Sequence, residues 1–160
     1  MFGNPHAIAN APPLVHTMNR ASAAEIAEHL RVCDDAFVPL LSERVDIDVY
    51  AGKIAAHAAR FETWADTLVG LLAVYCNDPE RQTAYVTSAS VHPAWHRCGI
   101  AAELVERCVA HVRERAFGAV ELEVDPANTR AVRLYASAGF RAIGACEARC
   151  MMRLRLGASR

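Results

Sequence analysis

Residues 91–102, Val-His-Pro-Ala-Trp-His-Arg-Cys-Gly-Ile-Ala-Ala, have the composition of a tight loop that opens a helix. Pro93 lacks a backbone donor and ends strand pairing, while Gly99 and Ala101 keep side-chain bulk away from the backbone. The first N–H groups of a helix have no intrahelical partner and carry part of the helix dipole, so they stabilise a phosphate. The segment predicts an anion-binding loop, although the ordinary alternative is a helix start that binds nothing.

Two polar side chains downstream could move protons. Tyr135 lies on an apolar helix stripe, where a tyrosine is usually a core residue, and its phenol is a candidate acid. Glu123 alternates with apolar residues on a strand, and its carboxylate is either a candidate base or an ordinary solvent-exposed group. For each residue the pattern alone leaves both interpretations open.

The elements that position these residues follow one another as strand, loop, helix and strand. Residues 84–91 form the strand that leads into the loop, and apolar positions at a 3.6-residue period predict a helix over residues 99–115. Gly118 is expected to terminate that helix, and residues 120–124 alternate as the next strand. A loop at the carboxyl end of a strand in such a unit is where open α/β sheets bind ligands.

Turn residues and helix caps divide the rest of the chain into further strands and helices. Ser22 and Glu25 have the spacing of a capping box. The expected elements are a strand at 13–18, helices that begin after Ser22 and after Asp46 or Asp48, a hairpin over 60–65 and 68–75, a helix from Asn128 to Gly139, and strands at 142–143 and 151–156.

The loop and a later segment together resemble the GNAT superfamily of N-acetyltransferases. His96-Arg97-Cys98-Gly99-Ile100-Ala101 is similar to the family's pyrophosphate motif, (Arg/Gln)-x-x-Gly-x-(Gly/Ala), with His96 in place of the usual Arg or Gln. Asn128, Ala131 and Leu134-Tyr135-Ala136-Ser137-Ala138-Gly139-Phe140 resemble its Asn…Ala…Leu-Tyr-x-x-x-Gly-Phe segment. Leu122-Glu123-Val124 resembles the Leu-Glu-Val segment of ribosomal-protein alanine acetyltransferases, the members that this chain matches best in motif.

The resemblance implies a mixed α/β fold with a mostly antiparallel sheet of about six or seven strands, flanked by about four helices. It also implies acetyl-coenzyme A as co-substrate, with no metal. The pyrophosphate is expected on the backbone of Arg97, Cys98, Gly99, Ile100, Ala101 and Ala102. The pantetheine arm is expected along the strand edge of Ala89, Ser90 and Val91, in contact with Asn128.

In the family, the matching tyrosine protonates the departing thiolate, and the resemblance gives this role to Tyr135. It makes Glu123 the base for the amine. One function class is an enzyme that moves acetyl directly to a primary amine, on a small molecule or a protein N-terminus, with both substrates bound. The other is a non-catalytic acyl-coenzyme A-binding or regulatory module, since fold does not fix function. A binding module has no need of a proton donor and acceptor, which favours the enzyme.

Composition restricts the partners and the compartment. The 160 residues, 53% of them hydrophobic, suit one domain over 14–156, with a loose lead-in at 1–13 and a tail at 157–160. A net charge of −1 gives no overall electrostatic attraction to nucleic acid or to an anionic membrane. The apolar runs are also too short to span a membrane. Six cysteines without C-x-x-C spacing predict reduced core thiols and a cytoplasmic protein. We expect a monomer or a small homo-oligomer.

Overall fold

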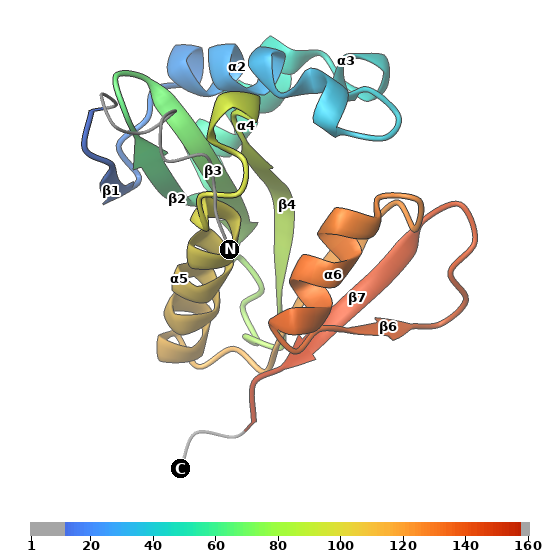
Figure 1. The fold of residues 1–160 in the computed structure, drawn as a ribbon. Helices are drawn as coiled ribbons and strands as arrows, with labels where there is room; N and C mark the ends of the chain where they lie inside the picture. The colour runs from blue at the N-terminus through green and yellow to red at the C-terminus, as the bar shows by residue number, and fades with distance from the viewer. Residues whose placement is uncertain (1–11, 158–160) are drawn as a thin grey trace.

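The computed structural model describes residues 12–157, which form a seven-stranded sheet in the order β1-β2-β3-β4-β5-β7-β6 (Figure 1). Most of the expected lead-in and tail therefore lies outside the described residues. The strands are β1 (Val15–Met18), β2 (Ala59–Trp64), β3 (Leu68–Tyr75), β4 (Thr83–Val91), β5 (Ala119–Val124), β6 (Arg141–Ile143) and β7 (Cys150–Arg155). The helices are α2 (Ala23–Val32), α3 (Leu41–Arg44), α4 (Ile47–His57), α5 (Ile100–Glu114) and α6 (Thr129–Ser137), with 3-10 turns η1 (Asp34–Ala36) and η2 (Pro93–Trp95).

All neighbouring strands are antiparallel except β4 and β5, which are parallel. The predicted mixed, mostly antiparallel sheet is therefore confirmed. The described part holds five α-helices rather than four, because the short α3 forms in a stretch without clear periodicity. None of the helices in residues 12–157 is long and apolar enough to cross a membrane.

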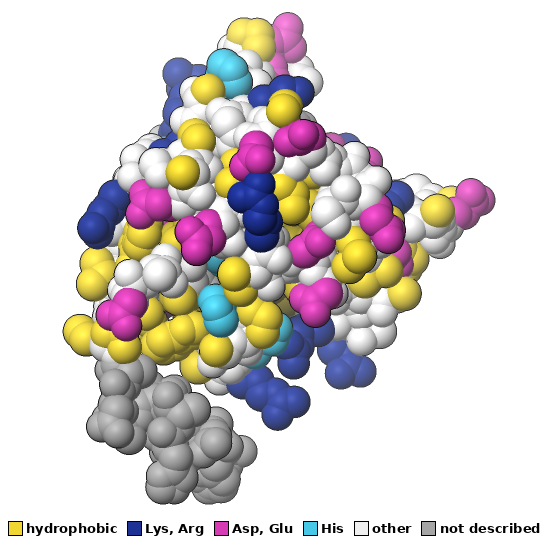
Figure 2. All heavy atoms as spheres, turned by 90° about the horizontal axis from the view of Figure 1, so that it is seen from above, with side chains coloured by type: hydrophobic (Ala, Val, Ile, Leu, Met, Phe, Trp, Pro, Cys, Tyr) yellow, Lys and Arg dark blue, Asp and Glu magenta, His cyan; other side chains and the backbone are white. Residues whose placement is uncertain are grey.

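Helices cover both faces of the sheet and enclose two apolar cores. The periodic stripe predicted for α5 is confirmed, since Ile100, Leu104 and Val112 are buried against one face together with Tyr135 of α6. Helices α2 and α4 bury Ile26 and other apolar residues against the opposite face. Seen from above, the end where α2 lies exposes acidic and basic side chains dispersed among hydrophobic and other neutral ones (Figure 2).

The expected caps form at three helix starts. Ser22 and Glu25 make the reciprocal capping box of α2, Asp46 accepts from the Val49 N–H at 3.0 Å, and Asn128 accepts from the Ala131 N–H at 3.2 Å. Each side chain satisfies an N–H group that has no partner inside its helix.

The expectations for Gly118 and for the cysteines were wrong. Ala116, not Gly118, takes the left-handed conformation after α5, with a φ of 63°. Cys146 and Cys150 form a disulfide at the start of β7, because the chain folds back to bring their Cα atoms to 4.4 Å. The other four cysteines are free, and two of them, Cys33 and Cys108, are buried as predicted.

Strands β4 and β5 separate partway along their length. Their parallel pairing ends at Val86 and Leu122, whereas β4 remains paired with β3 as far as Val91 and Gly70. Figure 1 shows β4 diverging from β7 above this point. In the described sheet, residues 87–91 therefore present one backbone edge that β5 does not cover, and that edge points toward α6.

A bulge in β4 accompanies the separation. Val86 pairs with Val74 and Ser88 with Ala73, so Thr87 is an extra residue. Before the bulge Ala84 and Val86 belong to the core under α5, and after it Ala89 and Val91 pack there. Because side chains alternate along a strand, this shift of one residue turns Thr87 and Ser88 together away from α5.

Candidate active site

One cavity, which we call the α5 cavity, has a volume of about 560 Å³ and lies between the uncovered β4 edge, the start of α5 and α6. Every residue predicted to hold the cofactor lines it except Cys98, whose thiol donates to the His96 carbonyl at 3.6 Å. The lining residues from the prediction are Ala89, Ser90, Val91, Arg97, Gly99, Ile100, Ala101, Ala102 and Asn128. The fold thus brings two separate sequence motifs to one cavity, while their binding roles remain predictions.

The loop before α5 uses two left-handed residues to turn the chain. Arg97 has a φ of 64° and Gly99, the N-cap of α5, has a φ of 77°. A Cβ added to Gly99 would meet no atom within 4 Å, so a side chain there would occupy the open space in front of the helix. Only glycine adopts this conformation without strain and leaves that space clear.

His96 joins this loop to both neighbouring elements. Its Nε2 lies 3.0 Å from the Val91 carbonyl, and its Nδ1 lies 3.1 Å from a guanidinium nitrogen of Arg130 on α6. Because a guanidinium can only donate, Nδ1 accepts and the Nε2 hydrogen is donated to Val91. His96, the residue that departs from the family motif, therefore joins the loop to the end of β4 through Nε2 and to α6 through Nδ1.

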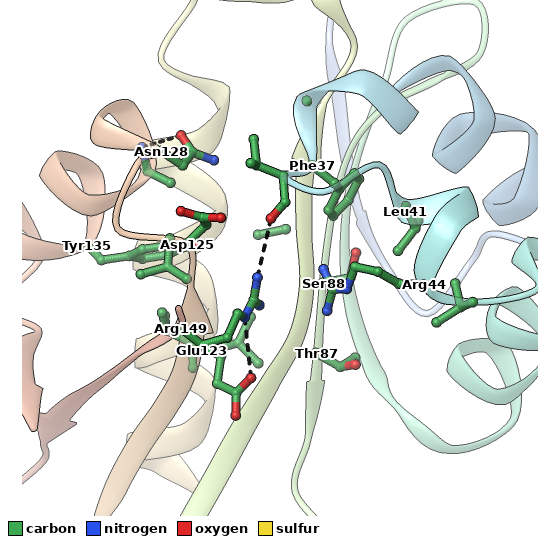
Figure 3. Close-up of a pocket in the computed structure, with 18 of the residues that line it drawn as sticks. Phe37, Leu41, Arg44, Thr87, Ser88, Glu123, Asp125, Asn128, Tyr135 and Arg149 are labelled. Atoms are coloured by element: carbon green, nitrogen blue, oxygen red, sulfur yellow. Dashed lines mark hydrogen bonds and ion pairs between the residues drawn. The ribbon is translucent and has the colours of Figure 1, made fainter. Parts of the chain in front are cut away.

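The second cavity, which we call the α3 cavity, has a volume of about 220 Å³ and lies across the separated strands (Figure 3). Phe37, Leu41 and Arg44 line one wall, and Glu123, Asp125 and Arg149 line the other. Arg149 bridges the walls, with Nε 3.6 Å from Glu123 Oε2 and an Nη1 hydrogen donated to the Val38 carbonyl at 3.4 Å (Figure 3).

The two cavities meet beside Tyr135. Ala36, Ala89, Asn128, Ala131 and Tyr135 line both. The Tyr135 ring packs edge-on against Phe140 at 5.7 Å between centroids, and the residue is 8% exposed. Burial raises the pKa of Tyr135 to about 12, so the phenol keeps its proton at neutral pH and is able to donate it.

Glu123 lies in the α3 cavity together with Tyr135 but does not line the α5 cavity. Its side chain is 41% exposed and faces the Arg149 guanidinium (Figure 3). Asp125, which the sequence did not single out, lies closer to Tyr135 in the same view and accepts from the Ala127 N–H at 2.8 Å. The base role of Glu123 remains a prediction.

Several cavity residues could not be found by sequence reasoning. Arg44 and Arg149 are surface-type residues more than 100 positions apart, and Ser88 lies on the side of the α3 cavity only because of the bulge. Within residues 12–157 no three His, Cys, Asp or Glu side chains gather as a metal site.

The family model for the acetyltransferase (GNAT) family matches residues 25–140. This chain belongs to the GNAT family. The predicted family and enzyme class, an acyltransferase, are therefore confirmed. No curated protein matches the sequence significantly.

Solved structures share the GNAT fold at low sequence identity. The yncA protein of Salmonella typhimurium, solved with its cofactor acetyl-CoA, is 20% identical, with 89% of this chain and 94% of that chain covered and a TM-score of 0.69. The ribosomal-protein-S18-alanine N-acetyltransferase of Escherichia coli is 16% identical over 91% and 97%, with a TM-score of 0.74. The ribosomal-protein-alanine N-acetyltransferase of Brucella melitensis is 17% identical over 88% and 99%, with a TM-score of 0.66.

Proposed function

We propose that this GNAT protein transfers acetyl from acetyl-coenzyme A directly to a primary amine, with both substrates bound at once. The observation that carries the proposal is the meeting of the two cavities at Tyr135, which gives each substrate its own approach to one point. The yncA structure, which contains acetyl-CoA on the same fold, supports the choice of co-substrate.

The residues of the α5 cavity suit this co-substrate. The open space in front of Gly99 and the N–H groups at the start of α5 would take the pyrophosphate. The uncovered backbone of Ala89 to Val91 would pair with the amide groups of the pantetheine arm, and Asn128 lies opposite. When bound, acetyl-coenzyme A supplies an acetyl group activated as a thioester.

Tyr135 and Glu123 would carry the two proton transfers. The Tyr135 hydroxyl, which is protonated at neutral pH, would donate its proton to the sulfur that leaves. The Glu123 carboxylate would accept a proton from the ammonium form of the acceptor, directly or through water, since it lies in the cavity opposite α3.

The second candidate is a non-catalytic acyl-coenzyme A-binding module. Such a module would need only the α5 cavity, so the adjoining α3 cavity with its carboxylates favours the enzyme. We further propose a cytoplasmic monomer or small homo-oligomer. The net charge of −1 supports the absence of nucleic-acid or membrane partners.

Tyr135→Phe tests the proposal because it keeps the ring packed on Phe140 and removes only the hydroxyl. We expect kcat for coenzyme A release to fall by about 10²–10⁴-fold, with the Kd of acetyl-coenzyme A retained. Tyr75→Phe, which lines neither of these cavities, is the matched control. Parental rates for Tyr135→Phe would remove its acid role, and a failure of every amine tested to release coenzyme A would favour the binding module. Initial-rate plots that intersect rather than run parallel test whether both substrates bind together.

A further inference from the structure

The Ser88 hydroxyl is a buried polar group without a protein partner. Ser88 is 4% exposed and lines the α3 cavity, and among the described residues its Oγ makes no hydrogen bond. Leaving a hydroxyl buried and unpaired is unfavourable, so an unpaired group in a native cavity points to a ligand atom that completes it.

Its neighbours on the same wall are already paired. The Tyr50 hydroxyl donates to the Thr87 carbonyl at 2.6 Å and lies 2.9 Å from the Thr87 hydroxyl. Burial raises the pKa of Tyr50, and the hydroxyls of Thr87 and Ser88 and the Arg44 guanidinium oppose that rise, which places all of these groups close together. Ser88 thus lies close enough to the Tyr50 hydroxyl to lower its pKa through a hydrogen-bonding contact, but its Oγ has no hydrogen bond of good geometry among the described residues.

Two guanidinium groups enter the same cavity from opposite walls. Arg44 reaches in from α3, and Arg149 reaches in from the segment before β7 (Figure 3). In residues 12–157 Arg44 has neither an ion-pair partner nor a hydrogen-bond partner within reach, and the Arg149 contact with Glu123 is long, at 3.6 Å. Tyr85 lines the same cavity, where burial raises the pKa of its phenol and the charges of Arg149 and Arg44 oppose that rise. The lining thus holds two guanidinium groups together with the carboxylates of Glu123 and Asp125, and within the described residues Arg44 is the lining cation without an ion-pair partner.

We propose that the acceptor is a small amine that also carries a carboxylate, which Arg44, Arg149 and the Ser88 hydroxyl bind. Planar guanidinium groups match the two oxygens of a carboxylate, and a hydroxyl adds a third donor. The amine end then lies toward Asp125 and Tyr135, on the side where the two cavities meet (Figure 3).

The enclosure favours a free compound over a peptide. The α3 cavity is about 220 Å³, and the Arg149 contact with the Val38 carbonyl joins its two walls. A compound of amino-acid size fits such a space, whereas a protein N-terminus would have to part that contact to enter. This inference rests on the proposed acetyl transfer and specifies its acceptor.

A panel of amino acids tests the inference, each compared with its decarboxylated amine, its carboxamide and a dipeptide that begins with it. We expect kcat/KM for coenzyme A release to be roughly 10- to 100-fold higher for the amino acid than for the amine or amide. Arg44→Gln and Ser88→Ala should each reduce that preference, by roughly tenfold for the lost guanidinium. Arg31→Gln, which removes an exposed arginine paired with Asp48 at 2.7 Å, is the matched control and should keep the parental preference.

A binding measurement keeps the inference separate from turnover. Calorimetry with an N-acetyl amino acid and its amide should detect tighter binding of the acid by the parent and loss of that difference in Arg44→Gln. Ser88→Ala should fold at least as stably as the parent, because it removes an unpaired buried hydroxyl.

Amines, amides or dipeptides that react as well as the amino acids would overturn the inference while leaving acetyl transfer intact. If no amine releases coenzyme A, the proposed function fails, and calorimetry still decides the carboxylate site. Equal binding of acid and amide by the parent would then exclude the site.

Discussion

His29 is a buried imidazole whose resistance to protonation should make the protein less stable in mild acid. The residue lies on α2 and is 3% exposed, with Nδ1 3.2 Å from the Leu68 carbonyl and Nε2 2.9 Å from the Ser90 hydroxyl. Burial lowers its pKa from 6.5 to about 4, against the opposing effect of those two hydrogen bonds. His29 also supports the β4 edge, because Ser90 lines the α5 cavity.

The sign and size of the effect follow from proton linkage. Between pH 6.5 and about 4 the unfolded chain binds a proton at this histidine and the folded chain does not, so stability falls as pH falls. At about 1.4 kcal/mol per pH unit, the whole shift corresponds to about 3 kcal/mol. From pH 7 to pH 5 the contribution of His29 to the free energy of unfolding should therefore fall by about 2 kcal/mol.

Urea denaturation, followed by circular dichroism at pH 7 and pH 5, measures how the free energy of unfolding changes with pH and so the contribution of His29. His29→Gln should be less stable than the parent at pH 7, by about 1–3 kcal/mol for its lost hydrogen bonds, but should lose about 2 kcal/mol less on acidification. His57→Gln removes an exposed histidine at the end of α4 and should keep the parental pH dependence. If His29→Gln and the parent lose equal stability between the two pH values, burial does not control this histidine.

Three further predictions concern the packing of β3 against α5, the loop before α5 and the candidate base. Gly70→Ala should lower the free energy of unfolding by about 1–3 kcal/mol in urea denaturation, because its Cβ would lie 2.7 Å from Ile100 Cγ2, whereas Gly52→Ala meets no atom within 4 Å and is the control. Gly99→Val should raise the calorimetric Kd of acetyl-coenzyme A by orders of magnitude, because a branched side chain would fill the space in front of α5; an unchanged Kd would place the pyrophosphate elsewhere. Glu123→Gln should lower kcat/KM most at moderate pH and recover as the amine deprotonates at higher pH, and a parental rate across a pH series would assign the base to another group.

The sequence by itself determined most of the helices, the strands and the loop that opens α5. Apolar positions at a 3.6-residue period and the caps at Ser22, Asp46 and Asn128 act between residues within one or two turns, so they can be recognised along the chain. The family motifs also placed Gly99 and Tyr135 in order, and the fold brings both to one cavity.

Tertiary structure alone decided which residues line the α3 cavity, which cysteines form a disulfide and how far the pKa of His29 is lowered. The bulge at Thr87 arises from pairing with β3, so the side to which Ser88 points cannot be derived from alternation. Arg44 and Arg149 line one cavity from opposite walls, and only the backbone path before β7 brings Cys146 to Cys150. The low pKa of His29 likewise depends on burial by β3 and β4. Local patterns encode elements, whereas strand pairing and desolvation between distant segments set the chemistry of the side chains that line the site.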